Sequence, residues 1–447
     1  MKRRWIACLC AAAMVMGMTA CGGGEDGAKE SANTTATDDG ASEETESDSA
    51  EDTGDSSSDG DVLTLEFFQQ KMEEGPQKGY QEIIDKFNAE NSDVQIEMNT
   101  VPDAGTVLTS RIASGDIPVL FSDYPTQVQF AQKVANGYVQ DLSDQEFLNN
   151  VEESALEMTK QDDGKYYALP YSRNYMGVYY NQEIFEENNL EVPETWDEFM
   201  EVCETLQNAG ITPIGLMGQD PGRVGHGFQC MTVAWDPEGV EAIEKTVAGE
   251  NKLAEDEGFR SVAEKTVQLL EYCNTDILGL ADTTCWENFA NGQYAMCITG
   301  SYARGTLLIA NPDLKMGVFP LPNDTKETTN TLSGIDAAIC VSAQATDEEK
   351  EAAYRFLAYL AEPENAQIFC DNDGAPSCIT GVMPNYEGIE PMMDLINAGQ
   401  VHDWMASTID NNIVTDLYNV TQGFWSERDV DTYLQQMDES IAITSAE

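Results

Sequence analysis

The sequence predicts an α/β fold, on three observations. Residues 63–67 alternate between apolar and polar side chains, as a half-buried strand does. The next apolar residues fall at helical spacing, at Tyr80, Ile83, Ile84 and Phe87, and residues 94–98 return to the strand pattern. This order predicts a β-α-β unit with a right-handed crossover and a parallel sheet. The 386 residues that follow position 61 of the 447-residue chain are enough for two lobes.

Further elements can be read along the chain. A helix is expected at 106–113 and a strand at 119–121, and residues 176–180 are expected to form another strand. Thr195 and Glu198 predict a capping box that opens a helix, which Gly210 can end. A second capping box is predicted at 346–349, and Pro363 should stop the helix that it opens.

The first 20 residues predict an export signal. Three basic residues, at positions 2–4, precede an apolar run over 5–18 that is too short to span a bilayer comfortably. The stretch from Met18 to Cys21 resembles a bacterial lipobox, in which a signal peptidase cuts before the cysteine and the cysteine thiol carries diacylglycerol. Residues 1–20 are therefore expected to be a lipoprotein signal peptide and Cys21 the lipid attachment site. The alternative is an ordinary cleaved signal with an incidental Cys21.

Residues 21–61 are expected to form an acidic, disordered tether. From Gly22 to Asp61 there are fourteen Asp and Glu against the single Lys29, and no aromatic residue. Such a segment has too little apolar surface to fold, and its like charges repel. A membrane tether fits this composition, and a spacer kept for solubility fits it equally well.

Overall charge and residue usage exclude several functions. The formal net charge of −57 argues against nucleic acid or an anionic membrane surface as a partner, because both favour basic proteins. Two histidines cannot supply a multi-histidine metal site. Eight of the eleven cysteines follow the tether without a C-x-x-C pair, and Cys370 and Cys378 are near enough to bridge, although free thiols are favoured.

Polar residues at the ends of predicted strands are the first site candidates. Gln69, Gln70 and Glu73 follow the first strand. Asp123 and Tyr124 follow the strand at 119–121. Ligands of open α/β sheets bind beyond the carboxyl ends of the strands. An ordinary polar loop is an equally good interpretation of each residue taken alone.

Three stretches, at 166–199, 289–302 and 332–339, together resemble family 1 extracellular solute-binding proteins, the sugar-binding subunits of bacterial ABC importers. The first contains Tyr-Tyr-Ala-Leu-Pro-Tyr at 166–171 and Thr-Trp-Asp-Glu at 195–198. The second runs from Phe289 through an Ala-Met strand to Gly300 and an aromatic residue, here Tyr302, where tryptophan is commoner in the family. The third, Leu-Ser-Gly-Ile-Asp-Ala-Ala-Ile, is expected to be a strand that returns to the first lobe.

This resemblance implies a periplasmic-binding-protein-like fold, with two α/β lobes, a hinge and a ligand cleft between the lobes. The N-terminal lobe is expected at 62–172 and 335–385, and the C-terminal lobe at 173–334 and 386–447. Ligand contacts from both lobes would favour the closed state.

A sugar site combines flat rings with hydrogen-bonding side chains. Tyr302, at the motif position, and Trp404, in a segment where the family supplies a stacking ring, are the leading candidates, followed by Trp235. The full set of expected ligand-binding residues is Tyr302, Trp404, Trp235, Asp123, Asp336, Tyr175, Asn174, Gln70, Glu73, Gly300 and Arg304. No catalytic residue, metal or cofactor is expected.

The sequence thus predicts a monomeric, lipid-anchored (palmitate-bearing) protein on the extracellular face of the cytoplasmic membrane of a Gram-positive bacterium. It would capture a carbohydrate, expected to be an oligosaccharide, and deliver it to the permease of an ABC importer. The alternatives are a secreted glycoside hydrolase and a binding protein for a non-sugar solute. No nucleophile elbow, Walker loop or zinc-protease motif supports an enzyme.

Overall fold

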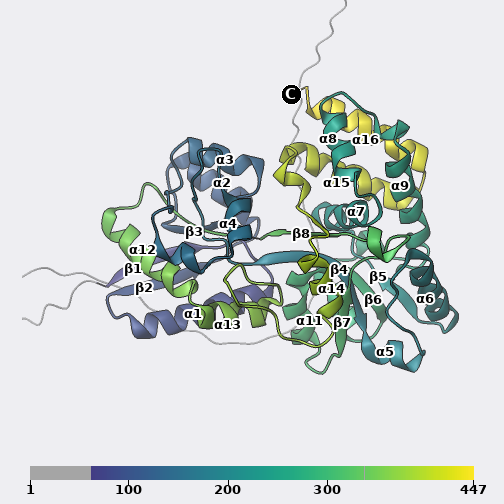
Figure 1. The fold of residues 1–447 in the computed structure, drawn as a ribbon, viewed down its shortest axis with the longest axis horizontal. Coiled ribbons are helices and arrows are strands. Elements are labelled where there is room, and N and C mark those ends of the chain that lie inside the picture. The colour runs from purple at the N-terminus through teal and green to yellow at the C-terminus, as the bar shows by residue number, and fades with distance from the viewer. Residues whose placement is uncertain (1–61, 337, 447) are drawn as a thin grey trace, which may run out of the picture. The chain divides into compact units, whose positions relative to one another are not determined.

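Two β-sheets organise the computed structural model, which describes residues 62–336 and 338–446 (Figure 1). The signal peptide, Cys21 and tether predicted at 1–61 lie outside these residues. Among the helices that the structure describes, none combines the length and the apolar character needed to cross a bilayer.

The first sheet has the strand order β2-β1-β3-β9. β1 pairs in parallel with β2 and with β3, as the predicted β-α-β unit requires, whereas β9 runs antiparallel to β3. The strands are β1 (Leu63–Phe68), β2 (Val94–Asn99), β3 (Leu120–Asp123) and β9 (Ala338–Val341). The helices that pack with this sheet are α1 (Glu74–Glu90), α2 (Ala104–Ser114), α3 (Val128–Ala135), η1 (Glu146–Asn150), α4 (Glu153–Thr159), α12 (Asp347–Leu360) and α13 (Pro363–Asp373).

The second sheet has the order β10-β8-β4-β6-β5, and β7 also pairs with β4. Its strands are β4 (Arg173–Asn181), β5 (Thr212–Gly215), β6 (Tyr294–Gly300), β7 (Met316–Phe319), β8 (Thr331–Ile335) and β10 (Val401–His402). The first three residues of β4 pair with β8, and the rest of the strand pairs with β6 and β7.

The remaining elements belong with the second sheet (Figure 1). They are α5 (Gln182–Glu187), α6 (Trp196–Asn208), α7 (Pro221–Trp235), α8 (Gly239–Val247), η2 (Leu253–Glu255), α9 (Glu257–Leu270), η3 (Ile277–Gly279), α10 (Asp282–Ala290), η4 (Ser301–Ala303), α11 (Arg304–Ala310), η5 (Lys326–Thr328), α14 (Glu390–Asn397), η6 (Met405–Ser407), α15 (Asn411–Glu427) and α16 (Val430–Thr444).

Local signals in the sequence produce the expected helices. In α1 the four residues at helical spacing, from Tyr80 to Phe87, are all buried. Both predicted capping boxes form, at Thr195 with Glu198 and at Thr346 with Glu349. α12 ends at Leu360, and Pro363 then occupies the first turn of α13, where its missing N–H has no cost.

The buried apolar side chains separate into groups that follow the two sheets. Two groups, around β1 and β3, draw on residues 65–171 and 335–382, and a third draws on residues 175–332 and 389–441. The α/β class and the two-lobe architecture are thus confirmed. The predicted boundaries at 172/173, 334/335 and 385/386 fall between these groups, and the exact assignment of residues to lobes stays a prediction.

The stretch at 332–339 differs from the single strand expected there. It forms two strands, because the pairing partners change at Asp336: β8 pairs with β4 and β10, and β9 pairs with β3 in the other sheet. This stretch therefore joins the two lobes.

Candidate ligand-binding site

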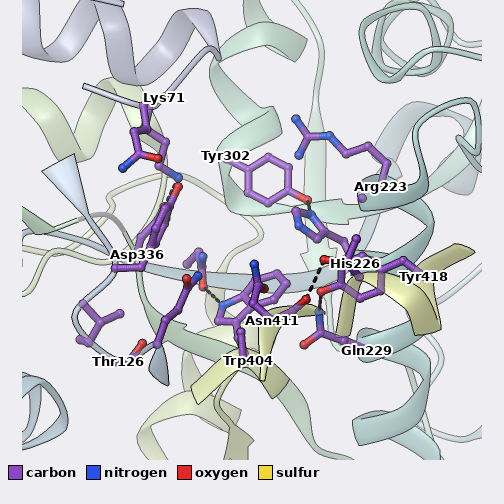
Figure 2. Close-up of a pocket in the computed structure, with 18 of the residues that line it drawn as sticks. Lys71, Thr126, Arg223, His226, Gln229, Tyr302, Asp336, Trp404, Asn411 and Tyr418 are labelled. Carbon is purple, nitrogen blue, oxygen red and sulfur yellow. Dashed lines mark hydrogen bonds and ion pairs between the residues drawn. The ribbon is translucent and has the colours of Figure 1, made fainter. Parts of the chain in front are cut away.

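A cavity of about 500 Å³ opens where loops of the first lobe face helices of the second (Figure 2). This volume is in the range of small-molecule binding sites. Its lining residues are Gln70, Lys71, Met72, Glu73, Tyr124, Thr126, Gln127, Asn174, Pro221, Gly222, Arg223, His226, Gln229, Tyr302, Ile335, Asp336, Trp404, Ala406, Asn411, Thr415 and Tyr418.

The loop that follows β1 supplies a polar wall of the cavity. Gln69 is fully buried, and its side chain both accepts from the backbone N–H of Lys71 (2.7 Å) and donates to the Lys71 carbonyl (2.8 Å). Gln70 is fixed in the same way, since its side-chain amide donates to the Ser122 carbonyl at the end of β3 (2.6 Å). The loop is therefore held in a defined shape before any ligand arrives.

Lys71 forms a buried ion pair with Asp336, which lies between β8 and β9 (Figure 2). Burial alone would lower the pKa of Lys71, but the Asp336 and Glu73 carboxylates outweigh it and raise the pKa. The pKa of Glu73 is lowered. Burial acts to raise this pKa, but the positive charges of Lys71 and Arg223 outweigh the effect of burial. Lys71 and Glu73 are thus both charged at neutral pH.

The aromatic ring of Tyr302 lies in η4, directly after β6. Gly300 makes this position possible, because a Cβ there would lie 2.2 Å from the Tyr302 ring. The Tyr302 hydroxyl is 2.9 Å from Nδ1 of His226, and the Arg223 guanidinium lies over the ring, 5.0 Å from its centroid. The ring is therefore fixed in orientation at the cavity surface.

Trp404 is fixed by a different set of contacts. Its Nε1–H donates to Oδ1 of Asn174 (2.7 Å), and its ring meets the His226 ring edge-on at 4.9 Å. The backbone of Gly334 lies beneath it, since a Cβ there would come within 3.0 Å of the indole. The pairing of β10 with β8 brings the two segments together.

His226, on α7, contacts both Tyr302 and Trp404 (Figure 2). Burial, with the nearby Arg223 charge, lowers the pKa of His226 to about 3. The imidazole is therefore neutral at physiological pH, with one nitrogen that donates and one that accepts.

Each of the two cations that line the cavity is paired with a carboxylate. Lys71 pairs with Asp336, and Arg223 pairs with Glu73 (3.1 Å) and with Asp282 (2.9 Å). A ligand anion would have to compete with these carboxylates. The charge arrangement therefore favours an uncharged ligand with hydroxyl groups that can both donate and accept hydrogen bonds.

Six of the eleven expected site residues line the cavity. They are Gln70, Glu73, Asn174, Tyr302, Asp336 and Trp404. They come from five separate stretches of sequence and from both lobes.

The other five do not line the cavity, and each has another place in the structure. Trp235 is buried against Trp196 and donates to the Pro322 carbonyl (3.0 Å). Asp123 pairs with Lys133 (2.5 Å). The fully buried Tyr175 hydroxyl contacts those of Tyr179 and Tyr386. Arg304 stacks on Tyr386, 3.9 Å from its centroid, and Gly300 supports Tyr302 from behind the site.

Several lining residues were not expected from the sequence. Lys71 lies between two residues that were, and His226 and Gln229 lie one turn apart on α7. Asn411, Thr415 and Tyr418 lie on one face of α15, with Tyr418 bonded to the Gln229 amide (2.5 Å). Their spacing of four and three residues is the one signal that could have grouped them.

Proteins of similar sequence and structure are binding proteins. The multiple sugar-binding protein of Streptococcus mutans is 28% identical over 351 residues, which cover 77% of this chain and 82% of that protein. The melibiose/raffinose/stachyose-binding protein MelE of Bacillus subtilis is 22% identical and covers 73% and 77%, respectively. The structure of RafE in complex with raffinose superimposes with a TM-score of 0.75 at 26% identity, over 86% of this chain and all (100%) of that one. Apo RafE from Streptococcus pneumoniae gives 0.70 at 26% identity, over 86% and 99%.

A family model described as bacterial extracellular solute-binding protein matches residues 82–390. This family and the relatives named above are described as solute-binding or sugar-binding proteins, which confirms the prediction of a binding protein over an enzyme. The chain belongs to the bacterial extracellular solute-binding proteins, as its three motif stretches predict.

Proposed function

We propose that this protein captures an oligosaccharide in the cavity between its lobes and delivers it to the permease of an ABC importer. The observation that carries the proposal is that one cavity is lined both by the fixed rings of Tyr302 and Trp404 and by the charged side chains of Lys71, Glu73 and Asp336. Rings pack against the C–H faces of a sugar, and charged groups form strong hydrogen bonds with its hydroxyls.

Relatives support the ligand class. Two similar proteins are named for sugars, and the structure with a TM-score of 0.75 holds raffinose. We therefore take raffinose, stachyose and melibiose as the first ligands to test. A dissociation constant near micromolar, about −8 kcal/mol, would suit capture followed by release.

Isothermal titration calorimetry of residues 62–447 with these three sugars tests the proposal. We expect saturable, stoichiometric heat with at least one sugar, and intact sugar on chromatography afterwards. A phosphorylated polyol serves as the comparison ligand, because the paired cations in the cavity should reject it. Binding of that anion without binding of any sugar would favour the alternative of a non-sugar solute.

Lipid anchoring through Cys21 is the second part of the proposal, and it rests on the sequence at 1–21. In a Gram-positive host, the full chain should fractionate with membranes and incorporate radiolabelled palmitate. A Cys21→Ser variant should lose the label and appear in the medium. A labelled Cys21→Ser variant would contradict anchoring at this residue.

A further inference from the structure

The two lobes touch through backbone atoms at a pair of glycines. Gly75 lies in the first turn of α1, and Gly305 lies in the first turn of α11. A Cβ added to Gly305 would come 2.6 Å from the Cα of Gly75 and 2.9 Å from the carbonyl oxygen of Asn372, at the end of α13. We call this contact the glycine seam.

The seam joins different lobes. α1 and α13 bury their apolar side chains in the group around β1, whereas Leu307 of α11 belongs to the group around the second sheet. The nearest atoms that a Gly305 side chain would meet therefore all belong to the other lobe. Gly75 differs, since its Cβ would first meet Asn372 of its own lobe, at 2.6 Å.

The seam also borders the cavity on both sides. Gly75 lies two residues after Glu73, and Gly305 lies three residues after Tyr302. The ion pair of Glu73 with Arg223, 3.1 Å between Oε1 and Nη2, joins the same two lobes. A change in the lobe separation at the seam would therefore change the distance between the two cavity walls.

We propose that Gly305 is a positioning residue for ligand binding: its missing side chain lets the walls approach closely enough to hold one ligand together. Backbone atoms at 2.6 and 2.9 Å cannot rotate away from a new methyl group, as a flexible side chain would. Gly305 has ordinary helical geometry, so alanine suits its own backbone. The added methyl group would therefore clash with the backbone of the other lobe rather than strain its own helix.

Gly305→Ala should therefore hold the two lobes further apart. If the closed state becomes about tenfold less populated, the apparent dissociation constant rises by the same factor, because only the closed state holds the ligand with both walls. Gly423→Ala is the matched control: Gly423 lies within α15 of the same lobe, and a Cβ there meets nothing within 4 Å.

Two measurements test whether Gly305→Ala separates the lobes. Calorimetry should show a dissociation constant about tenfold higher for Gly305→Ala and unchanged for Gly423→Ala. Small-angle X-ray scattering of the ligand-free proteins should show a larger radius of gyration for Gly305→Ala alone. Wild-type affinity and scattering in a folded Gly305→Ala variant would overturn the proposal, as would tighter binding.

The calorimetric test depends on the proposed sugar binding, whereas the scattering test does not. If the wild type fails to bind sugars, that result counts against the proposed function. Scattering of the ligand-free proteins would still test the role of Gly305. If Gly305→Ala does not fold, a second variant can be used. Glu73→Gln removes the ion pair with Arg223, which also joins the two lobes, without adding bulk. Its ligand-free scattering should also show expansion, and unchanged scattering would again overturn the proposal.

Discussion

The two walls of the cavity are built in different ways. The first-lobe wall consists of polar and charged side chains on loops that follow strands, with Lys71 and Asp336 held by mutual attraction. The second-lobe wall presents three rings beside polar side chains, and each ring is fixed by a hydrogen bond: Tyr302 to His226, Trp404 to Asn174 and Tyr418 to Gln229.

This difference suggests a division of work between the lobes. Charged groups on a loop can form strong, directional bonds with hydroxyls, and so distinguish one arrangement of hydroxyls from another. Rings on helices offer apolar area with little dependence on the exact ligand. We infer that the first lobe sets specificity and the second lobe supplies much of the affinity. The following predictions test this contrast, from the largest expected effect to the smallest.

The largest effect is expected at the charged wall. Asp336→Asn would leave Lys71 buried beside a weaker partner, and breaking a buried ion pair costs about 3 kcal/mol or more. We expect a matching loss in the free energy of unfolding, measured by urea denaturation, together with loss of sugar binding. The double variant Lys71→Met with Asp336→Leu should recover stability without recovering binding. An unchanged free energy of unfolding in Asp336→Asn would show that the ion pair of Lys71 with Asp336 does not stabilise this wall.

At the aromatic wall, Tyr302→Ala should weaken sugar binding by about 2–3 kcal/mol, or roughly 50-fold, because a buried ring is lost from the ligand contact. Calorimetry measures this change. Trp235→Phe is the control, since Trp235 is a buried ring of the same lobe outside the cavity, and should lower the melting temperature alone. Equal affinities of wild type and Tyr302→Ala would remove the ring from the site.

A pH response is expected behind the charged wall. Burial raises the pKa of Asp373 to about 7, although Lys71 opposes the shift, and neither carboxylate oxygen has a hydrogen-bond partner among the described residues. The folded state therefore keeps a proton that the unfolded state gives up. This contribution to stability is complete below about pH 4 and is lost as the pH rises through 7.

The stability of Asp373→Asn relative to wild type should accordingly be about 2–3 kcal/mol higher at pH 8 than at pH 5. Melting temperatures of both proteins at the two pH values measure the effect. His226, in the aromatic wall, has a pKa of about 3 and should leave sugar binding unchanged between pH 5 and 8. An advantage of Asp373→Asn that is the same at both pH values would contradict the assigned titration.

The smallest effect is expected from reductant. All eight cysteines of the described residues are buried and free, among them Cys370, whose Sγ–H donates to the Ala375 carbonyl (3.1 Å), and Cys378. Dithiothreitol should leave the melting temperature unchanged. Thiol titration of residues 62–447 in denaturant should give eight groups, and six would indicate a bridge.

The sequence could predict the part of the site that follows from topology. Gln70 and Glu73 follow a strand of a parallel sheet, and the rules for such sheets place them at the ligand edge. Tyr302 was found through the family motif and Gly300. The first β-α-β unit and both capping boxes were equally readable, because local spacing determines them.

The rest of the site depends on tertiary contacts that carry no local signal. Buried rings such as Tyr175 and Trp235 have the same sequence context as a ring that lines a cavity, so aromatic content could not separate them. His226 and Tyr418 lie within helices, where reasoning from strand ends does not apply. Lys71 is paired only because Asp336, far along the chain, returns beside it.

Strand order in the first sheet also constrains how the chain can be made. Strand β3 ends at residue 123, but its edge partner β9 begins only at residue 338, after the second sheet has received five of its strands. A polypeptide that emerges amino end first must therefore hold an unfinished sheet, with one open edge, until most of its length has appeared. Exposed edges invite pairing with other chains. Slow or interrupted synthesis of this protein should thus favour aggregation, and fragments that stop before β9 should not yield a stable first lobe.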